Sequence, residues 1–385
     1  MFKPAAGGSG SAWRADAIWA HMGMALVQVI NGGYHVVTKV ALNGGMNQVV
    51  FCAFRELVAL AILAPVAFVR DRGTTPPLTG RLLLSFFFLA LTGILGNQIL
   101  FLTGLGYTNP LFAAAVQPAI PVFTFMLASI VGVERVNFLT KEGWIKVIGT
   151  FVCVSGATVI LIYKGPALFG NGVHQTVPTD IIMGTRSEDV GWLGSGLLKF
   201  GLNNWQIGAL CLIGNCLCMA AYLVLQAPVL VMYPATLSLT AYTYFFGALL
   251  MVLSGLCTAR DYADWMVTKS ELIAIIYAGF LSSAFNYGIS TWCNKILGPA
   301  LIALYNPLQP LMSAFLSKVF IGGSIFLGSV YGGFLIVCGL YMVTWARFSE
   351  SKETMSKSCE DLISEPLLHE DTSSLQGQGS ASLIP

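Results

Sequence analysis

Ten apolar stretches, each close to the length that crosses a lipid bilayer, constrain this chain more than any other feature of its sequence. A helix rises about 1.5 Å per residue, so roughly 20 apolar residues cover the hydrocarbon core. Charged residues make up only 10% of the 385 residues, against about a quarter in soluble domains. The sequence therefore predicts an all-α membrane protein with ten transmembrane helices, at residues 17–40, 47–69, 82–106, 110–133, 144–163, 206–228, 235–257, 271–293, 299–321 and 326–346.

The two halves of the chain repeat each other. A single constant shift along the sequence, which aligns Pro110 with Pro299, also aligns further prolines and amides of the first half with those of the second. We call this shift the repeat offset. The other matched pairs are Pro118 with Pro307, Pro121 with Pro310, Asn97 with Asn286, and Gln117 with Asn306. The run Val147–Gly156 also resembles Val330–Gly339, whereas the first two spans of each half match more weakly. This self-similarity predicts a duplicated five-span unit.

The duplication organises the whole chain. We expect the first unit at residues 17–163 and the second at 205–346, joined by a Gly-rich polar loop at 164–204. Residues 1–16 form a short N-terminal segment. Residues 347–385 are polar, Ser-rich and aperiodic, which predicts a disordered tail.

An odd number of spans per unit makes the second unit enter the membrane from the opposite side. The sequence thus predicts an inverted-topology pair, which is the architecture that supports alternating access in many transporters. Duplication without a transport role is the alternative. The termini share one side with twelve Lys and Arg residues, against four in the short connections of the other side. Because cytoplasmic loops collect basic residues, we expect both termini in the cytoplasm and the 164–204 loop outside it.

Prolines lie inside the fourth and ninth apolar stretches. Proline removes a backbone donor and blocks the carbonyl four residues earlier, so backbone groups are freed that cannot face lipid unpaired. The sequence predicts helix kinks here, with amide side chains beside them either contacting a solute in a shared cavity or bonding neighbouring helices. The kink residues are Pro118, Pro121, Pro307 and Pro310, and the amides are Gln117, Asn306 and Gln309.

Arg55 is the most informative single residue. It lies about eight residues inside the second apolar stretch, and the matching position of the second half is Thr243. An arginine at the bilayer centre costs about 2.5–3.5 kcal/mol on insertion scales, so such residues usually face the protein interior. We expect it to bind a solute carboxylate or to form an internal ion pair with Glu56 or Glu134, and snorkelling to the interface is a third option.

Further polar residues complete the predicted solute site. Tyr34 and Lys39 lie near the end of the first stretch, where Lys39 could equally reach the interface. Asn97 and Asn286 occupy equivalent places in spans three and eight, and an amide in lipid lines a cavity or bonds another helix.

Several function classes find no support in the sequence. No catalytic constellation, phosphate-binding loop or paired Cys/His metal spacing is visible, so we expect no enzyme activity, cofactor or metal. The net charge of +2 is too small to indicate nucleic-acid binding, and the cysteines read as small packing residues. We expect a small-molecule substrate and the lipid bilayer as partners, and a homodimer stays open. Glu56 and His35 are the candidates for proton coupling, so a facilitator is credible.

A set of short motifs resembles the plant Walls-Are-Thin-related family. These motifs are Gly32–Asn43, Phe51 with Phe54 and Arg55, Gly96–Gln98, Tyr107–Pro110, Gln117–Phe125, Tyr163–Pro166, Gln226–Leu230, Tyr233–Pro234 and Tyr305–Pro307. The family is a branch of the drug/metabolite transporter superfamily with paired EamA domains, also called usually-multiple-acids-move-in-and-out transporters. The similarity covers roughly residues 20–346.

The resemblance implies ten helices in two inverted EamA repeats and transport of amino acids, auxin or related metabolites. It permits the plasma membrane, which we favour, or the vacuolar membrane. A multi-span membrane enzyme or a scaffold is the alternative function. This chain departs from the family pattern at Gly323, where a glutamate is common, and at Cys218–Tyr222, where tryptophans are usual. The usual solutes therefore cannot be assumed.

Overall fold

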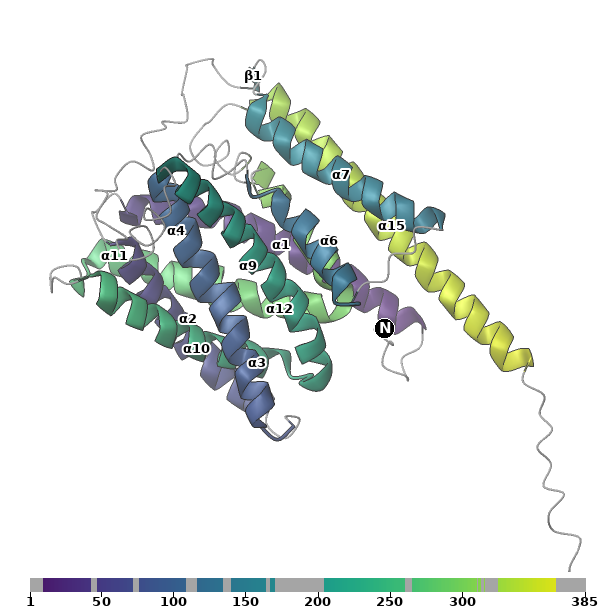
Figure 1. Cartoon of the computed structure of the whole chain (residues 1–385), viewed down its shortest axis with the longest axis horizontal. Helices are drawn as coiled ribbons and strands as arrows, with labels where there is room; N and C mark the ends of the chain where they lie inside the picture. Colours follow the sequence, from purple (N-terminus) through teal and green to yellow (C-terminus); the bar gives the residue numbers. More distant parts are fainter. Residues whose placement is uncertain are drawn as a thin grey trace, which may run out of the picture.

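The computed structural model describes residues 10–42, 47–71, 76–108, 116–133, 140–163, 167–169, 204–259, 265–309, 311–312, 315 and 325–364. These residues are helical apart from turns and one short antiparallel strand pair, β1 (Ala167–Phe169) and β2 (Ile325–Phe326). Figure 1 shows the helices gathered in a bundle, with α7 and α15 paired along one side. The all-α prediction is confirmed.

Each half contributes one long helical stretch with a π-helical segment in its middle. In the first half this stretch is α3–η1–α4 and in the second it is α11–η4–α12. The first half comprises α1 (Gly10–Leu42), α2 (Gln48–Arg70), α3 (Gly80–Ala90), η1 (Leu91–Gly96), α4 (Asn97–Tyr107), α6 (Ala119–Ile130) and α7 (Lys141–Ile162). The second comprises α9 (Asn204–Met232), α10 (Thr236–Thr258), α11 (Lys269–Tyr277), η4 (Ala278–Phe285), α12 (Asn286–Leu297), α13 (Pro299–Ala303) and α15 (Leu327–Ser364).

Side-chain caps define where several helices begin. The first turn of a helix has backbone N–H groups with no partner inside the helix, and a preceding Asn or Thr oxygen can accept from one of them. Asn47 accepts from the Val49 N–H at 3.0 Å, and Thr140 accepts from the Gly143 N–H at 3.3 Å. α11 begins with a capping box, in which the Glu271 carboxylate accepts from the Thr268 N–H at 2.8 Å.

Seven described helical stretches are long and apolar enough to cross a membrane. They are residues 48–70, 80–107, 141–160, 204–232, 236–258, 271–297 and 330–350, and Ala119–Ile130 is a shorter apolar helix. Large apolar side chains on the outer faces are exposed, as at Val69 (77%) and Ile130 (76%), which suits contact with lipid rather than water. The chain is a multi-pass membrane protein, while the count of ten spans stays a prediction because 110–115 and most of 310–324 lie outside the described residues.

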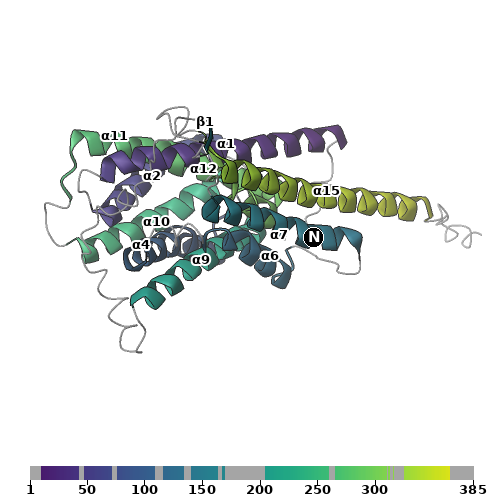
Figure 2. The same cartoon turned by 90° about the horizontal axis from the view of Figure 1, so that it is seen from above.

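α7 and α15 run antiparallel in close contact (Figures 1 and 2). Their backbones meet at two glycine pairs, because a Cβ on Gly339 would lie 2.5 Å from the Gly149 carbonyl oxygen and one on Gly332 would lie 2.5 Å from that of Gly156. Small residues let helices in lipid approach closely enough to gain dispersion energy. Gly149 lies beside Gly339, and Gly156, further along α7, lies beside Gly332, which is earlier in α15. The last helices of the two halves therefore run in opposite directions.

α2 and α10 form a second antiparallel pair. Asp71, just after the end of α2, accepts hydrogen bonds from the Ser238 N–H at 2.9 Å and the Ser238 hydroxyl at 2.7 Å near the start of α10. At the other end, Phe54 packs edge-on against Trp265 with ring centroids 5.9 Å apart, and Trp265 lies over Gly255. These helices occupy the same position in the two halves.

Buried apolar residues from both halves form a continuous core. Phe86 of α3 is fully buried between Tyr233 and Tyr242, with ring centroids 5.4 Å from each. The same cluster includes Met24 of α1 and Leu304 beside α13. The halves are therefore held together by apolar packing as well as by polar contacts between helices.

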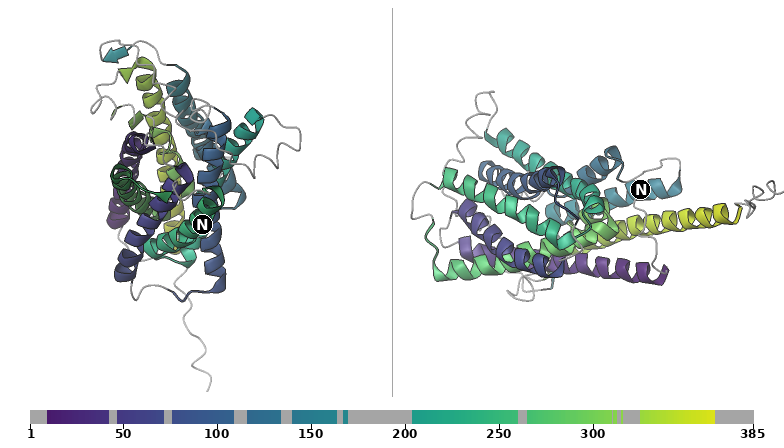
Figure 3. Two further views of the ribbon diagram at one scale, coloured as in Figure 1. Left: turned by 90° about the vertical axis from the view of Figure 1, so that its left-hand side faces the viewer. Right: turned by 90° about the horizontal axis from the view of Figure 1, so that it is seen from below.

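The prediction of a disordered tail from residue 347 is wrong for its first part, because α15 continues to Ser364. No glycine or proline interrupts the chain between Gly339 and Pro366, so nothing in the backbone ends the helix at the membrane boundary. Lys146 of α7 also donates to Glu350 at 2.5 Å, which ties the extension to the bundle. Figure 3 shows this end of α15 projecting beyond the other helices. Residues 365–385 lie outside the described residues.

We predict that Gly339→Ala destabilises the protein in detergent, because the new methyl group would lie 2.5 Å from the Gly149 carbonyl oxygen and 2.6 Å from the Cys153 amide nitrogen. Such overpacking typically costs about 1–3 kcal/mol. The thermal midpoint of the purified protein should fall. Gly106→Ala is the matched control, since a Cβ there has no neighbour within 4 Å. Equal midpoints for the two variants would contradict the close packing.

Candidate functional site

Both halves carry a π-helical segment at the same register. η1 ends at Gly96, and the next amide, that of Asn97, donates to the Ile94 and Thr92 carbonyls. η4 ends at Phe285, and the amide of Asn286 donates to the Ser283 and Leu281 carbonyls, which are the equivalent positions of the second half. π segments are rare and occur frequently at functional sites. The wider turn brings each asparagine to the same place in its half.

The fourth and ninth spans are broken rather than merely bent. Pro121 has no N–H to give to the Gln117 carbonyl, and the N–H of Ile120 donates to it instead at 3.0 Å. In the second half, the Asn306 carbonyl accepts from the Gln309 N–H at 3.0 Å, which is the same bond between repeat-equivalent residues. Short three-residue turns therefore replace the α-helical bonds that the prolines prevent. Pro118 and Pro307 lie in these turns, and Pro310 lies outside the described residues.

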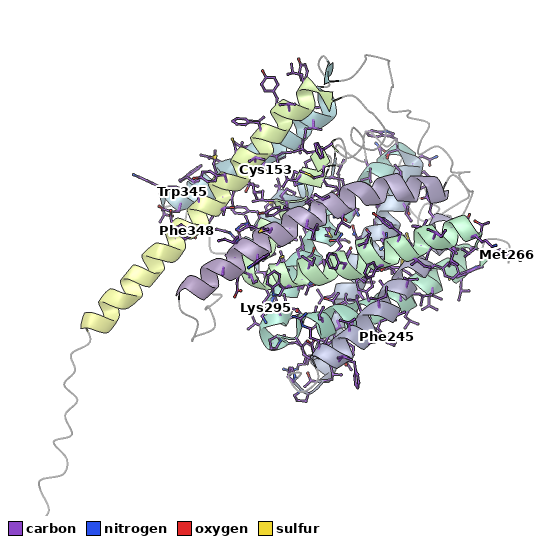
Figure 4. The ribbon with its side chains drawn as sticks, turned by 180° about the vertical axis from the view of Figure 1, so that it is seen from behind. Cys153, Phe245, Met266, Lys295, Trp345 and Phe348 are labelled. Carbon is purple, nitrogen blue, oxygen red and sulfur yellow. The ribbon has the colours of Figure 1, made fainter. Side chains whose placement is uncertain are left out.

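Cysteine thiols donate to backbone carbonyls that lose their helical hydrogen bonds at the breaks. The Cys216 thiol of α9 lies 3.5 Å from the Val116 carbonyl oxygen, and that of Cys153 lies 3.6 Å from the Leu304 carbonyl oxygen. Figure 4 labels Cys153, which is fully buried between α7 and the rest of the bundle. A thiol is a weak donor, yet it gives each of these two carbonyls a hydrogen-bond partner where hydrocarbon offers none. These cysteines thus do more than the packing role that the sequence suggests.

Asn97 and Gln117 meet at a residue that the sequence analysis did not select. The Asn215 amide of α9 donates to the Asn97 carbonyl at 2.7 Å and to the Asn97 side-chain oxygen at 2.5 Å. Gln117 donates to the Asn215 side-chain oxygen at 3.2 Å, and Asn215 is only 2% exposed. In this arrangement both predicted site amides bond a neighbouring helix.

Asn286 takes part in the corresponding contact of the other half. It donates to Asn31 of α1 at 2.5 Å and accepts from the Ser290 hydroxyl at 3.3 Å. The third span of each half thus bonds the first span of the other half, through Asn97 with Asn215 and through Asn286 with Asn31. This reciprocal exchange couples the two halves at the level of the π segments.

Arg55 forms the internal ion pair with Glu56. Its guanidinium donates to Glu56 Oε1 at 2.6 and 3.2 Å, and Gln98 donates to the same oxygen at 2.6 Å. Glu56 is fully buried, and the Arg55 side chain is 11% exposed. Gly279 of η4 packs against this turn of α2, since a Cβ there would lie 3.0 Å from the Arg55 carbonyl oxygen. The charge pair therefore borders the second π segment.

A fourth polar cluster joins α9, α10 and α12, and the sequence analysis selected none of its members as site residues, although Gln226 begins one of the family motifs. The Asn294 amide donates to Gln226 at 2.7 Å, while Gln226 donates to the hydroxyls of Thr291 at 2.9 Å and Tyr222 at 3.0 Å. Thr240 of α10 donates to Thr291 at 3.1 Å. The spacing of Thr291 and Asn294 by three residues puts both on one helix face, which was the available signal.

Three tyrosines link these clusters. Tyr287 lies between Tyr244 and Tyr222, with ring centroids 5.4 and 6.0 Å away. The Tyr222 ring fits against Gly93 of η1, where any Cβ would lie 2.3 Å from the ring. Glycine at this position therefore lets the aromatic row reach the first π segment.

The inner face of α1 holds an unpaired amide. His21 contacts the Tyr305 hydroxyl at 2.6 Å, and Asn31 bonds Asn286. Gln28 lies between them in sequence at helical spacing and is 1% exposed, yet no described residue bonds either atom of its side-chain amide. A buried amide without partners costs about 1–3 kcal/mol, so Gln28 is a destabilising position in this arrangement of the described residues.

Comparison with known proteins identifies the family to which the chain belongs. The EamA-like transporter family matches residues 18–162 and 206–345, which together exceed half of the chain. This chain belongs to the EamA-like transporter family. Protein WALLS ARE THIN 1 of Arabidopsis thaliana is 37% identical over 88% of this chain and 85% of its own length. An auxin-induced protein of Pinus taeda is 34% identical over 91% of this chain and 84% of its own length.

The resemblance to the Walls-Are-Thin-related proteins is thereby confirmed. A WAT1-related protein of Arabidopsis thaliana is 38% identical over 87% of this chain and 84% of its own length. One solved structure superposes with a TM-score of 0.60 at 16% identity, over 85% of this chain and 98% of that one, which shows a shared fold. As an EamA-like transporter, the chain is a membrane protein whose family moves small solutes.

The predicted site residues of this EamA-like protein lie in four separate clusters. Asn97 and Gln117 share one cluster, Asn286 lies in a second, Arg55 lies in a third, and Asn306 and Gln309 lie half-buried in the second break. The side chains of Tyr34 and Lys39 lie outside the described part of the structure. Within that part, no three His, Cys, Asp or Glu side chains are grouped to hold a metal ion.

We predict a measurable coupling between Asn97 and Asn215. A double-mutant cycle with Asn97→Ala and Asn215→Ala should give an interaction energy of about 0.6–1.7 kcal/mol, as for other hydrogen bonds between membrane helices. The readout is the unfolding free energy in mixed micelles. The cycle of Asn97→Ala with Asn286→Ala is the control, because those residues bond different partners. Strictly additive effects in the first cycle would refute the contact.

Proposed function

We propose that this EamA-like protein carries small organic solutes by alternating access between two five-helix halves of opposite orientation. The observation that supports this proposal best is that both halves contain the same two interruptions of regular helix. Each half has a π segment followed by an asparagine, and each has a helix that is broken at prolines beside an amide side chain. In transporters with inverted repeats, interrupted helices at the repeat interface form the solute site.

Opposite orientation is supported by the helix directions. α7 is antiparallel to α15 and α2 is antiparallel to α10, as equivalent helices of inverted units must be. The family matches the chain twice, once in each half. The distribution of Lys and Arg favours cytoplasmic termini, and we retain the plasma membrane as the favoured location and the vacuolar membrane as the alternative.

The solute site in this proposal is the polar layer between the halves. In the described arrangement the amides bond one another, so this is a state in which the layer is closed. When the halves separate, a solute replaces these internal bonds and keeps the groups paired. The solute contacts are Tyr34, Lys39, Arg55, Asn97, Gln117, Asn286, Asn306 and Gln309 from the sequence analysis, with Gln28 added by the structure.

Amino acids or auxin-like carboxylates suit this layer. Arg55 supplies a cation that matches a carboxylate, and the row of Tyr222, Tyr287 and Tyr244 offers ring faces for an apolar or aromatic group. The chain would act on such solutes as a facilitator or an exporter.

The direct experiment is counterflow in vesicles that contain only this protein. Vesicles loaded with one unlabelled solute are diluted into its labelled form, with a panel of amino acids and indole-3-acetate. We expect saturable accumulation of at least one labelled solute. Absence of saturable counterflow for every member of the panel would instead favour the scaffold or enzyme alternative.

We predict that Gln28→Leu lowers the flux without lowering stability. The substitution removes an amide that has no described partner, so the unfolding free energy should stay equal or rise. Loss of one solute hydrogen bond of about 1.4 kcal/mol would lower kcat/KM about ten-fold. Met24→Leu, at another buried position of the same helix, is the volume-conserving control. Unchanged kcat/KM in Gln28→Leu would remove Gln28 from the site.

A further inference from the structure

Apolar side chains recur along the outer face of α15 at alternating intervals of three and four residues. This spacing is that of the a and d positions in a heptad repeat abcdefg, and we call these positions the a/d stripe. Within the apolar span of α15 the stripe consists of Tyr331, Phe334, Cys338, Tyr341, Trp345 and Phe348. Phe334 is 66% exposed and Tyr341 is 69% exposed, and Figure 4 labels Trp345 and Phe348 on this helix. The stripe is therefore exposed over much of its length.

The contact between α15 and α7 uses a different face of the helix. Gly332 and Gly339, which pack against α7, are b positions when Tyr331 is counted as a. Glu350, which accepts from Lys146 of α7, is an f position. Positions b and f lie on nearly the opposite side of a helix from a and d. The packing of the two halves of one chain thus leaves the a/d stripe facing outward.

The face toward α7 becomes charged where the apolar span ends. That span reaches residue 350, whereas α15 continues to residue 364 and projects beyond the bundle in Figure 3. In this extension the sequence has Glu353, Lys357 and Glu360 at the b and f positions. Such a change is expected where a helix leaves its bundle and that face meets water.

The a/d stripe, by contrast, stays apolar beyond the span. It continues with Met355, Cys359 and Leu362, and Lys352 is its single charged position. A lysine at one a position of a parallel coiled coil helps to fix the register, at a cost in stability. The e and g positions from 349 to 358 are all serine, so they place no like charges beside the stripe. Lipid accounts for an apolar face inside the bilayer, but it does not account for the continuation of that face outside it.

We propose that α15 pairs with α15 of a second copy of this chain, in a parallel coiled coil that begins in the membrane and continues beyond it. Two copies inserted in the same orientation are related by a two-fold axis along the membrane normal, so their equivalent helices are parallel. From residue 331 to residue 362 the stripe covers more than four heptads, and about three to four heptads are enough to indicate a coiled coil. The pairing does not depend on the proposed transport function.

Two further features favour a second copy as the occupant. Tyr341 lies near the middle of the 330–350 span, where hydrocarbon offers its hydroxyl no hydrogen-bond partner. In a parallel pair, the equivalent hydroxyl of the second copy lies at the same depth. The extension after residue 350 is also short for a helix that stands alone in water, because isolated helices below about 12–15 residues are marginal. Packing of its apolar face against a partner stabilises it.

Thiol cross-linking of the full chain in vesicles tests the register of this pair. A water-soluble bis-maleimide is present on both sides of the membrane, and Cys257→Ser removes the exposed cysteine at the end of α10. This form keeps Cys359, an a position, and should become a covalent dimer on a denaturing gel. In the background that also carries Cys359→Ser, Leu362→Cys at a d position should cross-link as well. Lys357→Cys, at an f position of the same extension, is the matched control and should stay monomeric.

Substitutions in the stripe test whether the pairing holds the copies together. Tyr341→Ala with Trp345→Ala removes two aromatic side chains, so the cross-linked fraction at Cys359 should fall several-fold. Phe245→Ala removes a side chain of α10 that is also exposed to lipid (50%), and it should leave that fraction unchanged. The thermal midpoint of each variant reports folding.

A second pair of variants lies outside the membrane span, where a folding defect is not expected. Met355→Asp puts a charge at a d position and should abolish cross-linking at Cys359, whereas Thr354→Asp, at the neighbouring c position, should not. Two results would overturn the proposal: no cross-link at positions 359 and 362, or equal cross-linking at 357, 359 and 362, which indicates random collision. Equal cross-linking in Met355→Asp and Thr354→Asp would overturn it as well.

Discussion

Hydrocarbon offers no hydrogen-bond partners, and this constraint determines most of what the structure does with its polar groups. Carbonyls freed by Pro121 and Pro307 accept from N–H groups one residue nearer, and the carbonyls of Val116 and Leu304 accept from cysteine thiols. Asparagines pair across helices for the same reason. Among the described residues, pairing is incomplete at six buried side-chain atoms, which are both amide atoms of Gln28, Glu56 Oε2, Gln98 Oε1, the Thr103 hydroxyl and Asn294 Oδ1. Gln28 is the amide with neither atom bonded, and for that reason we propose it as a solute contact.

Duplication explains how the interruptions are arranged. In the described part of each half, a π segment and a broken helix lie at the same repeat offset, and the asparagine that follows each π segment bonds the first span of the opposite half. Asn97 and Asn286 thus each bond an asparagine of the other half. Movement of one half against the other therefore breaks both contacts together, and a solute that bonds the same amides would compensate. The glycine-paired helices α7 and α15 lie outside this exchange and can hold the halves together while it occurs.

The sequence predicted the helical class, the approximate positions of the apolar spans and the register of the repeat, because apolar length and proline spacing are local signals. It did not predict that Asn215 would bridge Asn97 and Gln117, since Asn215 does not match Asn31 at the repeat offset and carries no motif. The π segments also left no pattern that hydrophobic periodicity could detect. The extension of α15 to Ser364 was missed because polar composition was read as disorder, although the absence of glycine and proline permitted a helix. For Arg55, the sequence left a solute carboxylate, an ion pair with Glu56 or Glu134, and snorkelling open, and the described contacts show the ion pair with Glu56.

The central claim is that the polar layer between the two halves, which includes both broken helices, opens to each side of the membrane in turn. Gln117→Cys and Asn306→Cys place a label at equivalent positions of the two halves, and a membrane-impermeant maleimide can be added from either side, with the parent chain measured for background labelling. Because both positions line the same layer, the account predicts that each of them reacts from either side of the membrane as the halves alternate, and that a transported solute lowers both reactivities. Labelling of both positions that stays restricted to one side of the membrane and does not respond to solute would contradict it.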